Sequence, residues 1–297
     1  MLKQRLGLKM FAKIGMPAPR VAHARVFVNR RYIGLYQLIE PIDKLFLARV
    51  YGKHADGVVE NNGYLYEYAW KDAYLFDYLG DDLRIYAELF EPKSHETDAP
   101  AVLYGPLEDL FRTFNSVSDS QFEREVGRLL DLHQFARHLA VENFIAEYDG
   151  FLGHWGPNNF YLYRFQNREI SQVLPWDKDM AFWDIRYDIF QNIESNVLAL
   201  RALQVPSVYH TYVETLIECA RAASEPDEEG SSTGWLEAEV YRTIQQIHDA
   251  GLEDENKRFS SERFDDELIK VLEFAGQRGP YVLREASKAL AHASLGR

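Results

Sequence analysis

Residues 131–150, DLHQFARHLAVENFIAEYDG, restrict the possible folds of this chain more than any other segment. On a helical wheel their apolar residues lie on two opposite sides, one containing Leu139 and the other Phe144. A helix that is apolar nearly all round is buried on most sides, so other elements must cover it. The helical pattern stops at Asp149-Gly150 and gives way to strand-like residues. We therefore expect a buried helix that leads through an acidic loop into a β-hairpin.

The hairpin is predicted from two runs of β-forming residues, NNFYLYRF and EISQVLPW, with a turn at residues 167–168. Counting back along both strands from that turn places Asn158 and Asn159 opposite Trp176 and Asp177. Opposed residues in such a pair have Cβ atoms roughly 5 Å apart. Two amides and a carboxylate therefore meet at the open end of the hairpin, and Asp149 lies in the loop that leads into it.

The whole pattern predicts an α+β fold. We divide the chain into a β-rich part, residues 1–104, and a helix-rich part, residues 105–297, which carries the hairpin 158–177 and has a helical tail from about residue 205. The expected elements are a helix over 2–14, a hairpin over 20–40, a helix over 41–52, strands over 63–70 and 84–92, and helices over 106–117, 120–130, 205–223, 234–249, 262–275 and 280–293.

Composition narrows the class of protein. The formal net charge of −13 argues against a general nucleic-acid or anionic-membrane surface. The single cysteine, Cys219, excludes an internal disulfide and a cysteine-rich zinc site, and its apolar helical position predicts a buried thiol. No run approaches the roughly 18 apolar residues of a membrane span, and residues 1–15 do not look like a signal peptide. As it stands, the sequence predicts a soluble cytoplasmic protein.

Carboxylates and amides that converge at one loop edge form an oxygen-rich site. Mg²⁺ and Mn²⁺ prefer oxygen ligands, and Mg²⁺ usually takes one or two carboxylates plus phosphate oxygens. A phosphoryl-transfer enzyme needs an Asp near the incoming hydroxyl, and an Asn and an Asp at the metal. Protein kinases supply these groups in the order helix, Asp loop with Asn, hairpin, metal-binding Asp. This chain has the same order, with Asp149, then Asn158 or Asn159, the hairpin and Asp177.

Plainer interpretations of the same residues stay open. Asp149 also suits the end of a helix before glycine, and the two asparagines also suit turns. Asp177 and Asp179 also fit solvated loop acids or a structural Ca²⁺ site, although an EF-hand is excluded because Phe182 occupies the place that needs glycine. There is no G-x-S-x-G and no phosphate-binding glycine-rich loop, so a hydrolase triad or a P-loop has no support.

Four runs of the sequence are informative together: RLGLKMFAKIGMPAPRVAHARVFVNRRYIGLYQLIEPIDKLFL, FARHLAVENFIAEYDGF, NNFYLYRF and LPWDKDMAF. In this order they resemble the CotH family of spore-coat protein kinases, over roughly residues 1–185. The resemblance implies an atypical protein-kinase-like fold with two lobes. It also implies transfer of the γ-phosphate of ATP to Ser or Thr of protein substrates, with Mg²⁺ or Mn²⁺ as the metal.

The resemblance also implies roles for individual residues. Asp149 takes the catalytic position that orients the acceptor hydroxyl, and Asp177 takes the metal-binding position, with Asp179 as a second ligand or support. Asn159 is the favoured amide ligand of the metal, with Asn158 as the alternative.

Two further residues match family-like blocks. Glu40, in LIEPIDK, is expected to face nucleotide or a basic partner, and Lys93, in FEPKSHE, is expected to approach phosphate. The plainer interpretations are a strand-end carboxylate and a solvated lysine.

The resemblance implies additional strands before the LGLKMF block, one of them carrying a lysine that helps to hold phosphates. This sequence starts at that block. We expect either that the natural chain is longer, in which case the added part would also carry any export signal, or that the first lobe is shortened and nucleotide binding is impaired.

Three functions are therefore expected from the sequence. The first is a kinase dependent on ATP and a divalent metal, acting on a protein with a Ser or Thr acceptor. The second is a binding or scaffold protein on the same fold, with impaired catalysis. The third is a metal-dependent phosphohydrolase that uses the same acids on water.

Overall fold

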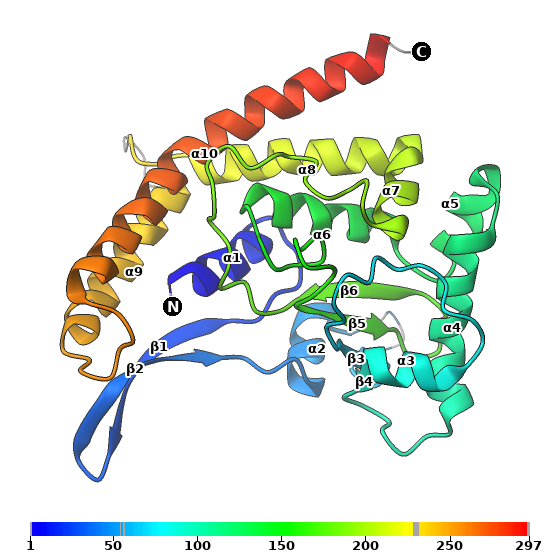
Figure 1. Cartoon of the computed structure of the whole chain (residues 1–297), viewed down its shortest axis with the longest axis horizontal. Helices are drawn as coiled ribbons and strands as arrows, with labels where there is room; N and C mark the ends of the chain where they lie inside the picture. Colours follow the sequence, from blue (N-terminus) through cyan, green and yellow to red (C-terminus); the bar gives the residue numbers. More distant parts are fainter. Residues whose placement is uncertain (1, 54, 56, 228–231, 296–297) are drawn as a thin grey trace.

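Helices and small antiparallel sheets alternate along the chain in the computed structural model, which describes residues 2–53, 55, 57–227 and 232–295 (Figure 1). The α+β class predicted from the sequence is confirmed. In chain order the elements are α1 (Leu2–Lys13), β1 (Val21–Val28), β2 (Arg31–Ile39), α2 (Lys44–Tyr51), β3 (Tyr64–Tyr68), α3 (Leu83–Leu89), β4 (Phe90–Pro92), α4 (Pro100–Ser116), α5 (Asp119–Gly127), α6 (Leu132–Phe144), β5 (Phe160–Arg164), β6 (Ser171–Pro175), α7 (Val197–Gln204), α8 (Pro206–Ser224), α9 (Trp235–Leu252) and α10 (Ser261–Leu295).

The strands form two separate sheets. β1 and β2 make a two-stranded hairpin whose far end projects away from the rest of the molecule (Figure 1). The second sheet has four antiparallel strands in the order β4-β3-β5-β6. The β5–β6 hairpin therefore forms one side of a larger sheet, with β6 at its edge.

Alternation along β5 gives the four-stranded sheet two apolar faces, because successive side chains of a strand point to opposite sides. Tyr161 and Tyr163 pack on one face with Phe46 of α2. Phe160 and Leu162 pack on the other face in the main core of the molecule. The sheet is thus held between α2 and the helical part of the chain.

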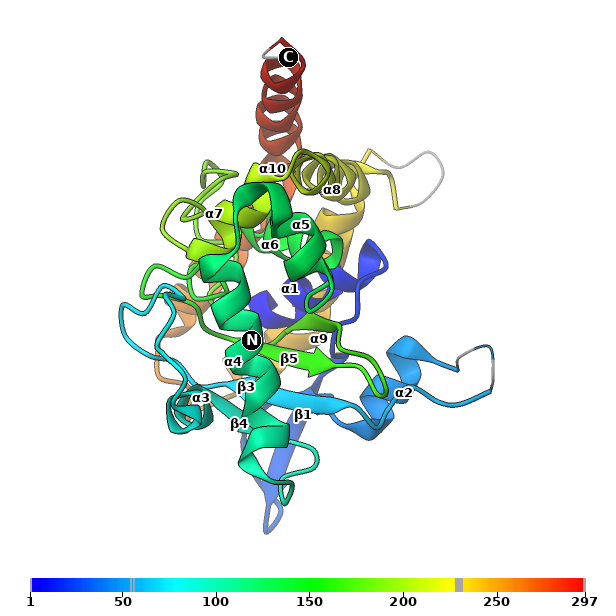
Figure 2. The same cartoon turned by 90° about the vertical axis from the view of Figure 1, so that its right-hand side faces the viewer.

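The predicted buried helix is α6, which lies between α8 and the β5–β6 hairpin (Figures 1 and 2). Phe135, Leu139 and Phe144 have no exposed surface, as the all-round apolar pattern predicts. Gln134 of α6 pairs with the outer edge of β6: its amide donates to the carbonyl of Val173 at 2.7 Å and accepts from the Val173 N–H at 3.1 Å. These bonds fix the position of the helix against the hairpin.

Some predicted elements are wrong in detail. Residues 84–92, predicted as a strand, form mostly the helix α3, and only the last three residues are strand. The two helices predicted over 262–275 and 280–293 are one helix, α10, which continues through Pro280. The short helix α7 was not predicted.

The boundary predicted after residue 104 lies inside α4, and the four-stranded sheet joins β3 and β4 to β5 across it. The division into two kinase-like lobes therefore stays a prediction. Within the described residues, none of the helices is long and apolar enough to cross a membrane, as predicted. Cys219 is buried in α8, also as predicted.

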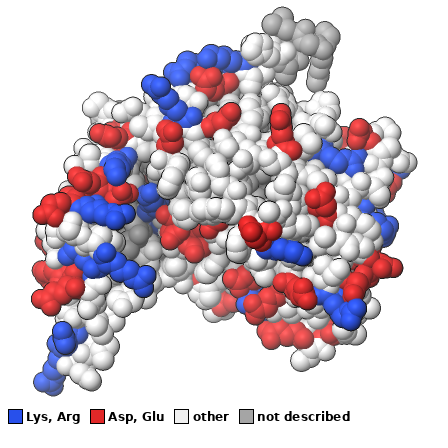
Figure 3. All heavy atoms as spheres, in the orientation of Figure 1, with Lys and Arg blue, Asp and Glu red and all other residues white. Residues whose placement is uncertain are grey.

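The visible molecular surface in Figure 3 carries acidic and basic side chains side by side. Basic side chains lie at the end of the β1–β2 hairpin, where Arg30 and Arg31 are exposed.

Candidate active site

The predicted register of the β5–β6 hairpin is confirmed. Phe160 pairs with Pro175, and the same register continues one step outward, where the Trp176 N–H donates to the Asn159 carbonyl at 3.1 Å. Asp177 follows immediately. The hairpin thus brings the segment with the asparagines and the segment with Asp177 to the same open end.

Asp149 joins this end of the hairpin through direct hydrogen bonds. The Asn158 amide donates to both carboxylate oxygens of Asp149, each at 3.2 Å. The Asn159 amide donates to the Asp149 carbonyl at 2.8 Å and to its Oδ2 at 3.1 Å. These bonds use the amide nitrogens, so the two amide oxygens are not engaged by this carboxylate. The structure therefore brings together the catalytic and amide residues expected from the sequence.

The backbone at this site adopts an uncommon conformation at two of the predicted residues. Asn159 has φ of 56° and Asp177 has φ of 36°, both in the left-handed region. Asn and Asp tolerate this region better than other residues with side chains, but it still costs stability. Strained backbone of this kind concentrates at functional sites, where the surroundings hold it in place.

Burial changes the acidity of both aspartates at the hairpin end. Partial burial raises the pKa of Asp149, although the amides of Asn158 and Asn159 and the charge of Lys178 oppose the shift. Burial also raises the pKa of Asp177, and the neighbouring Asp179 adds to the rise. A carboxylate with a raised pKa is a better proton acceptor and a better partner for an incoming cation than an exposed one.

Beneath the aspartates lies a buried ion pair that the sequence analysis did not predict. Lys178 and Glu142 are almost completely buried, and Lys178 Nζ lies 2.7 Å from Glu142 Oε1. Glu142 Oε1 also contacts His138 Nε2 at 3.1 Å. The charge of Lys178, followed by that of His138, lowers the pKa of Glu142 to about 2 against the opposing effect of burial. A carboxylate inside a helix that is apolar all round is the sequence signal that could have indicated a buried acid at Glu142, although not its partner.

Glu147 is a second buried acid that the sequence analysis missed. Its Oε1 accepts the Asp149 N–H at 3.0 Å, while Oε2 has no hydrogen-bond partner among the described residues. Burial raises the pKa of Glu147 to about 8. The side chain is therefore neutral at neutral pH and supports the backbone of Asp149 from below.

Gly150 follows Asp149 because there is no room for a side chain at this position. A Cβ atom there would lie 2.6 Å from the carboxylate of Glu142, which also accepts the Phe151 N–H at 2.7 Å. The Asp-Gly pair is thus more than a helix end: it lets the loop at residues 149–151 pass over the buried carboxylate of Glu142.

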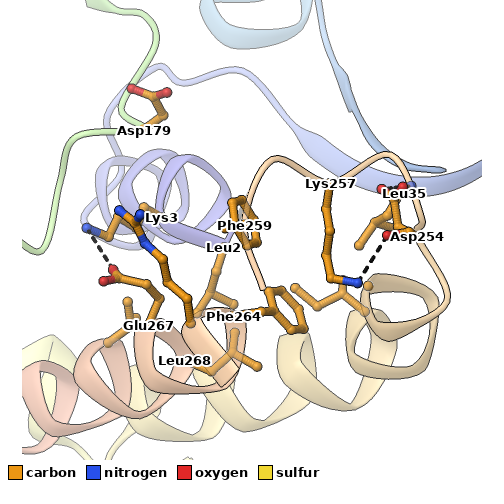
Figure 4. A pocket seen from close by; sticks show the side chains of 14 residues that line it. Leu2, Lys3, Leu35, Asp179, Asp254, Lys257, Phe259, Phe264, Glu267 and Leu268 are labelled. Atoms are coloured by element: carbon orange, nitrogen blue, oxygen red, sulfur yellow. Dashed lines mark hydrogen bonds and ion pairs between the residues drawn. The ribbon is translucent and has the colours of Figure 1, made fainter. Parts of the chain in front are cut away.

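Asp179 is two residues beyond Asp177 and contributes to the wall of a separate cavity. It is exposed and lines a cavity of about 290 Å³ between α1, β2, α9 and α10. In Figure 4 it lies on the segment above α1, apart from Phe259 and Phe264 at the other side of the cavity. The position fits a supporting role beside Asp177 better than a place among the asparagines.

The rest of the cavity wall includes both positively and negatively charged side chains. Lys3 lies 3.9 Å from Glu267, and Lys257 donates to the Asp254 carbonyl at 3.0 Å (Figure 4). Most of the wall is apolar, formed by Leu2, Leu35, Ile247, Phe259, Phe264, Leu268 and Val271.

Glu40 lies between two arginines of the same chain. Arg20 and Arg49 both bind its carboxylate, at 2.8 Å and 2.5 Å, and lower the pKa of Glu40 to about 2. A basic partner for Glu40 was one of the two expectations. Both arginines belong to this chain, and among the described residues no hydrogen bond or ion pair joins the Glu40 carboxylate to Asp177.

Lys93 is also paired within the chain. Its Nζ lies 2.8 Å from Glu67 and 2.8 Å from Glu91, on the two neighbouring strands β3 and β4. Within the described residues, no hydrogen bond connects it to the asparagines or to Asp149. A phosphate-binding role for Lys93 stays a prediction.

The donor set at the hairpin end suits a metal that arrives with phosphate. In the part of the chain that the structure describes, no three His, Cys, Asp or Glu side chains gather into a group that could hold a metal ion by themselves. The oxygens available are the carboxylate of Asp177 and the amide oxygens of Asn158 and Asn159. Because Mg²⁺ commonly takes one or two carboxylates and completes its shell with water and phosphate oxygens, the residues present fit it.

Comparison with known proteins identifies a family and a relative. The family model described as CotH kinase protein matches residues 1–282. The inner spore coat protein H of Bacillus subtilis (strain 168) is 26% identical to this chain over 292 residues, which cover 95% of this chain and 74% of that protein. The family match continues beyond the site through α7, α8 and α9 into α10.

Proposed function

This chain belongs to the CotH kinase protein family, and on that premise we propose that it is an atypical protein kinase. It transfers the γ-phosphate of ATP to Ser or Thr of a protein substrate and uses Mg²⁺ or Mn²⁺. The observation that supports this most strongly is the meeting of Asp149, Asn158, Asn159 and Asp177 at one end of the β5–β6 hairpin. A protein contributes to phosphoryl transfer mainly by positioning groups and stabilising charge, with little covalent chemistry, and these residues suit the positioning.

Asp149 is the proposed catalytic residue. The amides of Asn158 and Asn159 hold its carboxylate in one orientation, and the N–H of Asp149 is held in turn by Glu147. In this position Asp149 orients the acceptor hydroxyl and receives its proton. Its raised pKa, which results from burial, favours that transfer.

Asp177 and Asn159 are the proposed metal ligands, with Asn158 as the alternative amide and Asp179 as support. When bound, the metal neutralises negative charge on the phosphate oxygens. Asp177 provides the negative charge that binds the metal. The neighbouring carboxylates of Asp179 and Asp149 both raise the pKa of Asp177, so a cation next to Asp177 is favoured further.

The kinase proposal is tested with ATP labelled on its γ-phosphate, in the presence of Mn²⁺ or Mg²⁺ and a basic Ser-containing protein. The wild type should label itself or that protein. Asp149→Asn should reduce the rate by about 10²–10⁴-fold, the usual contribution of a positioned base, and Asp177→Asn should abolish labelling. Asp184→Asn, at an exposed acid nine residues after the end of β6, is the matched control and should label normally.

Two other results would replace the proposal. Release of free phosphate without any labelled protein would identify the site as a phosphohydrolase that acts on water. Failure of the wild type to bind ATP at all would favour a binding or scaffold protein on the kinase fold.

A further inference from the structure

Lys178 occupies an unusual place for a lysine between two aspartates. Both neighbours, Asp177 and Asp179, are at least partly accessible, whereas the Lys178 side chain has no exposed surface. Its Nζ contacts Glu142 Oε1 at 2.7 Å and donates to the carbonyl oxygen of Asn159 at 3.0 Å. The lysine therefore points inward and binds one group on each of two segments, Glu142 of α6 and the backbone of Asn159.

Glu142 connects Lys178 to the rest of the catalytic loop. Its Oε2 accepts the Phe151 N–H at 2.7 Å, and its carboxylate fills the space beneath Gly150. The loop that carries Asp149 thus rests on the same carboxylate that binds Lys178. Three segments of the site, at residues 149–151, 159 and 177–178, meet at this one ion pair.

Stability alone does not explain the pair. Replacing a buried ion pair with apolar groups of similar size is often neutral or even stabilising, because two charges must lose their hydration on folding. The backbone at Asn159 and Asp177 is left-handed, however, and such strain persists only where the surroundings fix it. Lys178 is bonded to the carbonyl of Asn159 and covalently joined to Asp177, so it restrains both residues.

We propose that Lys178 and Glu142 form a positioning pair that holds Asn159 and Asp177 in the geometry needed to bind the metal. The inference rests on the proposed function, since it assigns a role around that same site. Neither residue touches the reacting groups. Outer residues that orient metal ligands typically change metal affinity by 10–100-fold when they are replaced.

The decisive variant is the double substitution Lys178→Met with Glu142→Gln, which removes both charges and keeps similar volumes. The matched control is Arg137→Met with Glu218→Gln, which removes a partly exposed ion pair of 2.7 Å that joins the same helix α6 to α8. Mn²⁺ affinity is measured by calorimetry in the presence of a non-hydrolysable ATP analogue, and folding by urea unfolding of the same samples.

We expect the double variant to unfold cooperatively yet to bind Mn²⁺ about 10–100-fold more weakly, while the control pair binds it as the wild type does. If the folded double variant binds Mn²⁺ with wild-type affinity, the pair is merely structural. That result would overturn this inference and leave the proposed function standing. A wild type that does not bind Mn²⁺ would overturn the proposed function and the inference with it.

A second variant covers the case in which the double variant does not fold. Lys178→Arg keeps a cation opposite Glu142, but its planar guanidinium cannot occupy the position of the ammonium next to the Asn159 carbonyl. We expect it to fold and to bind Mn²⁺ roughly 10-fold more weakly. Unchanged affinity in this variant would also contradict a positioning role.

Discussion

At the scale of single residues, Asn159 and Asp177 are distinguished by three independent features. Strand register places their segments together, their backbone is left-handed, and burial together with nearby acids raises the pKa of Asp177. The left-handed backbone and the burial of Asp177 near other acids each have a cost, and a bound cation would offset the electrostatic part of that cost. The site therefore has the properties of a protein prepared for a ligand.

Glu147 gives a prediction on pH dependence. Its pKa is about 8 in the folded state, against an ordinary value of 4.5. Between these values the folded chain holds a proton that the unfolded chain has lost, so the free energy of unfolding should fall as the pH rises from about 4.5 to about 8. One group accounts for at most roughly 5 kcal/mol of this fall, at 1.36 kcal/mol per pKa unit.

Glu147→Gln should remove this part of the pH dependence, because the amide stays neutral and can still accept the Asp149 N–H. Urea unfolding at a series of pH values measures it. Glu88→Gln, at an exposed position in α3, is the control and should leave the profile unchanged. An unaltered profile in Glu147→Gln would show that Glu147 is ionised in the folded state.

The residues of the site were predictable from sequence only where local geometry determined them. The position of Asn158 and Asn159 near Asp177 followed from strand pairing, whose register is fixed by the turn. The partner of Lys178 was not predictable, because Glu142 comes from a helix earlier in the chain and meets the lysine only after α6 has packed against the hairpin. The pairs formed by Glu40 and Lys93 are likewise tertiary.

At the scale of elements, local signals explain both the correct and the wrong predictions. The apolar pattern of α6 and the alternation in β1, β2, β5 and β6 were strong enough to identify them. In α3 the alternation of Ile85 and Ala87 favoured a strand, but Asp82 caps a helix there by accepting the Arg84 N–H at 3.0 Å. In α10 the two predicted helices, 262–275 and 280–293, are joined into one, and Pro280 lies inside it.

Gly150→Ala tests the close contact between the catalytic loop and α6. A Cβ at this position would lie 2.6 Å from Glu142, so we expect a loss of about 1–3 kcal/mol in the free energy of unfolding. Gly105→Ala is the matched control in the interior of α4, where nothing lies within 4 Å of the new Cβ. It should gain about 0.5–1 kcal/mol. Thermal or urea unfolding that ranks the two variants in the opposite order would contradict the packing described for the loop.

At the scale of the whole molecule, Arg278 links the C-terminal helix α10 to the site. It is fully buried and donates to the carbonyls of Asn143 and Phe144 at the end of α6, at 2.5 Å and 2.8 Å, and to those of Ile185 and Tyr187. The helical tail, to which the sequence analysis assigned only packing, thus holds the end of the helix that leads to Asp149.

Arg278→Met should cost about 3–5 kcal/mol, because it removes a buried charged donor that binds four backbone carbonyls. Urea unfolding measures the loss. Arg284→Met removes an exposed arginine paired with Glu285 on the same helix and should change stability by less than about 0.5 kcal/mol. Equal stability of the two variants would show that α10 does not hold the end of α6 in this way.

The central claim is that the open end of the β5–β6 hairpin binds a divalent metal together with a nucleotide. It is tested most directly by anomalous X-ray scattering from Mn²⁺ in crystals grown with a non-hydrolysable ATP analogue. We predict an anomalous peak at about 2.0–2.2 Å from a carboxylate oxygen of Asp177, with the amide oxygen of Asn159 or Asn158 and phosphate oxygens completing the shell. A bound Mn²⁺ whose ligands do not include Asp177 would contradict the account.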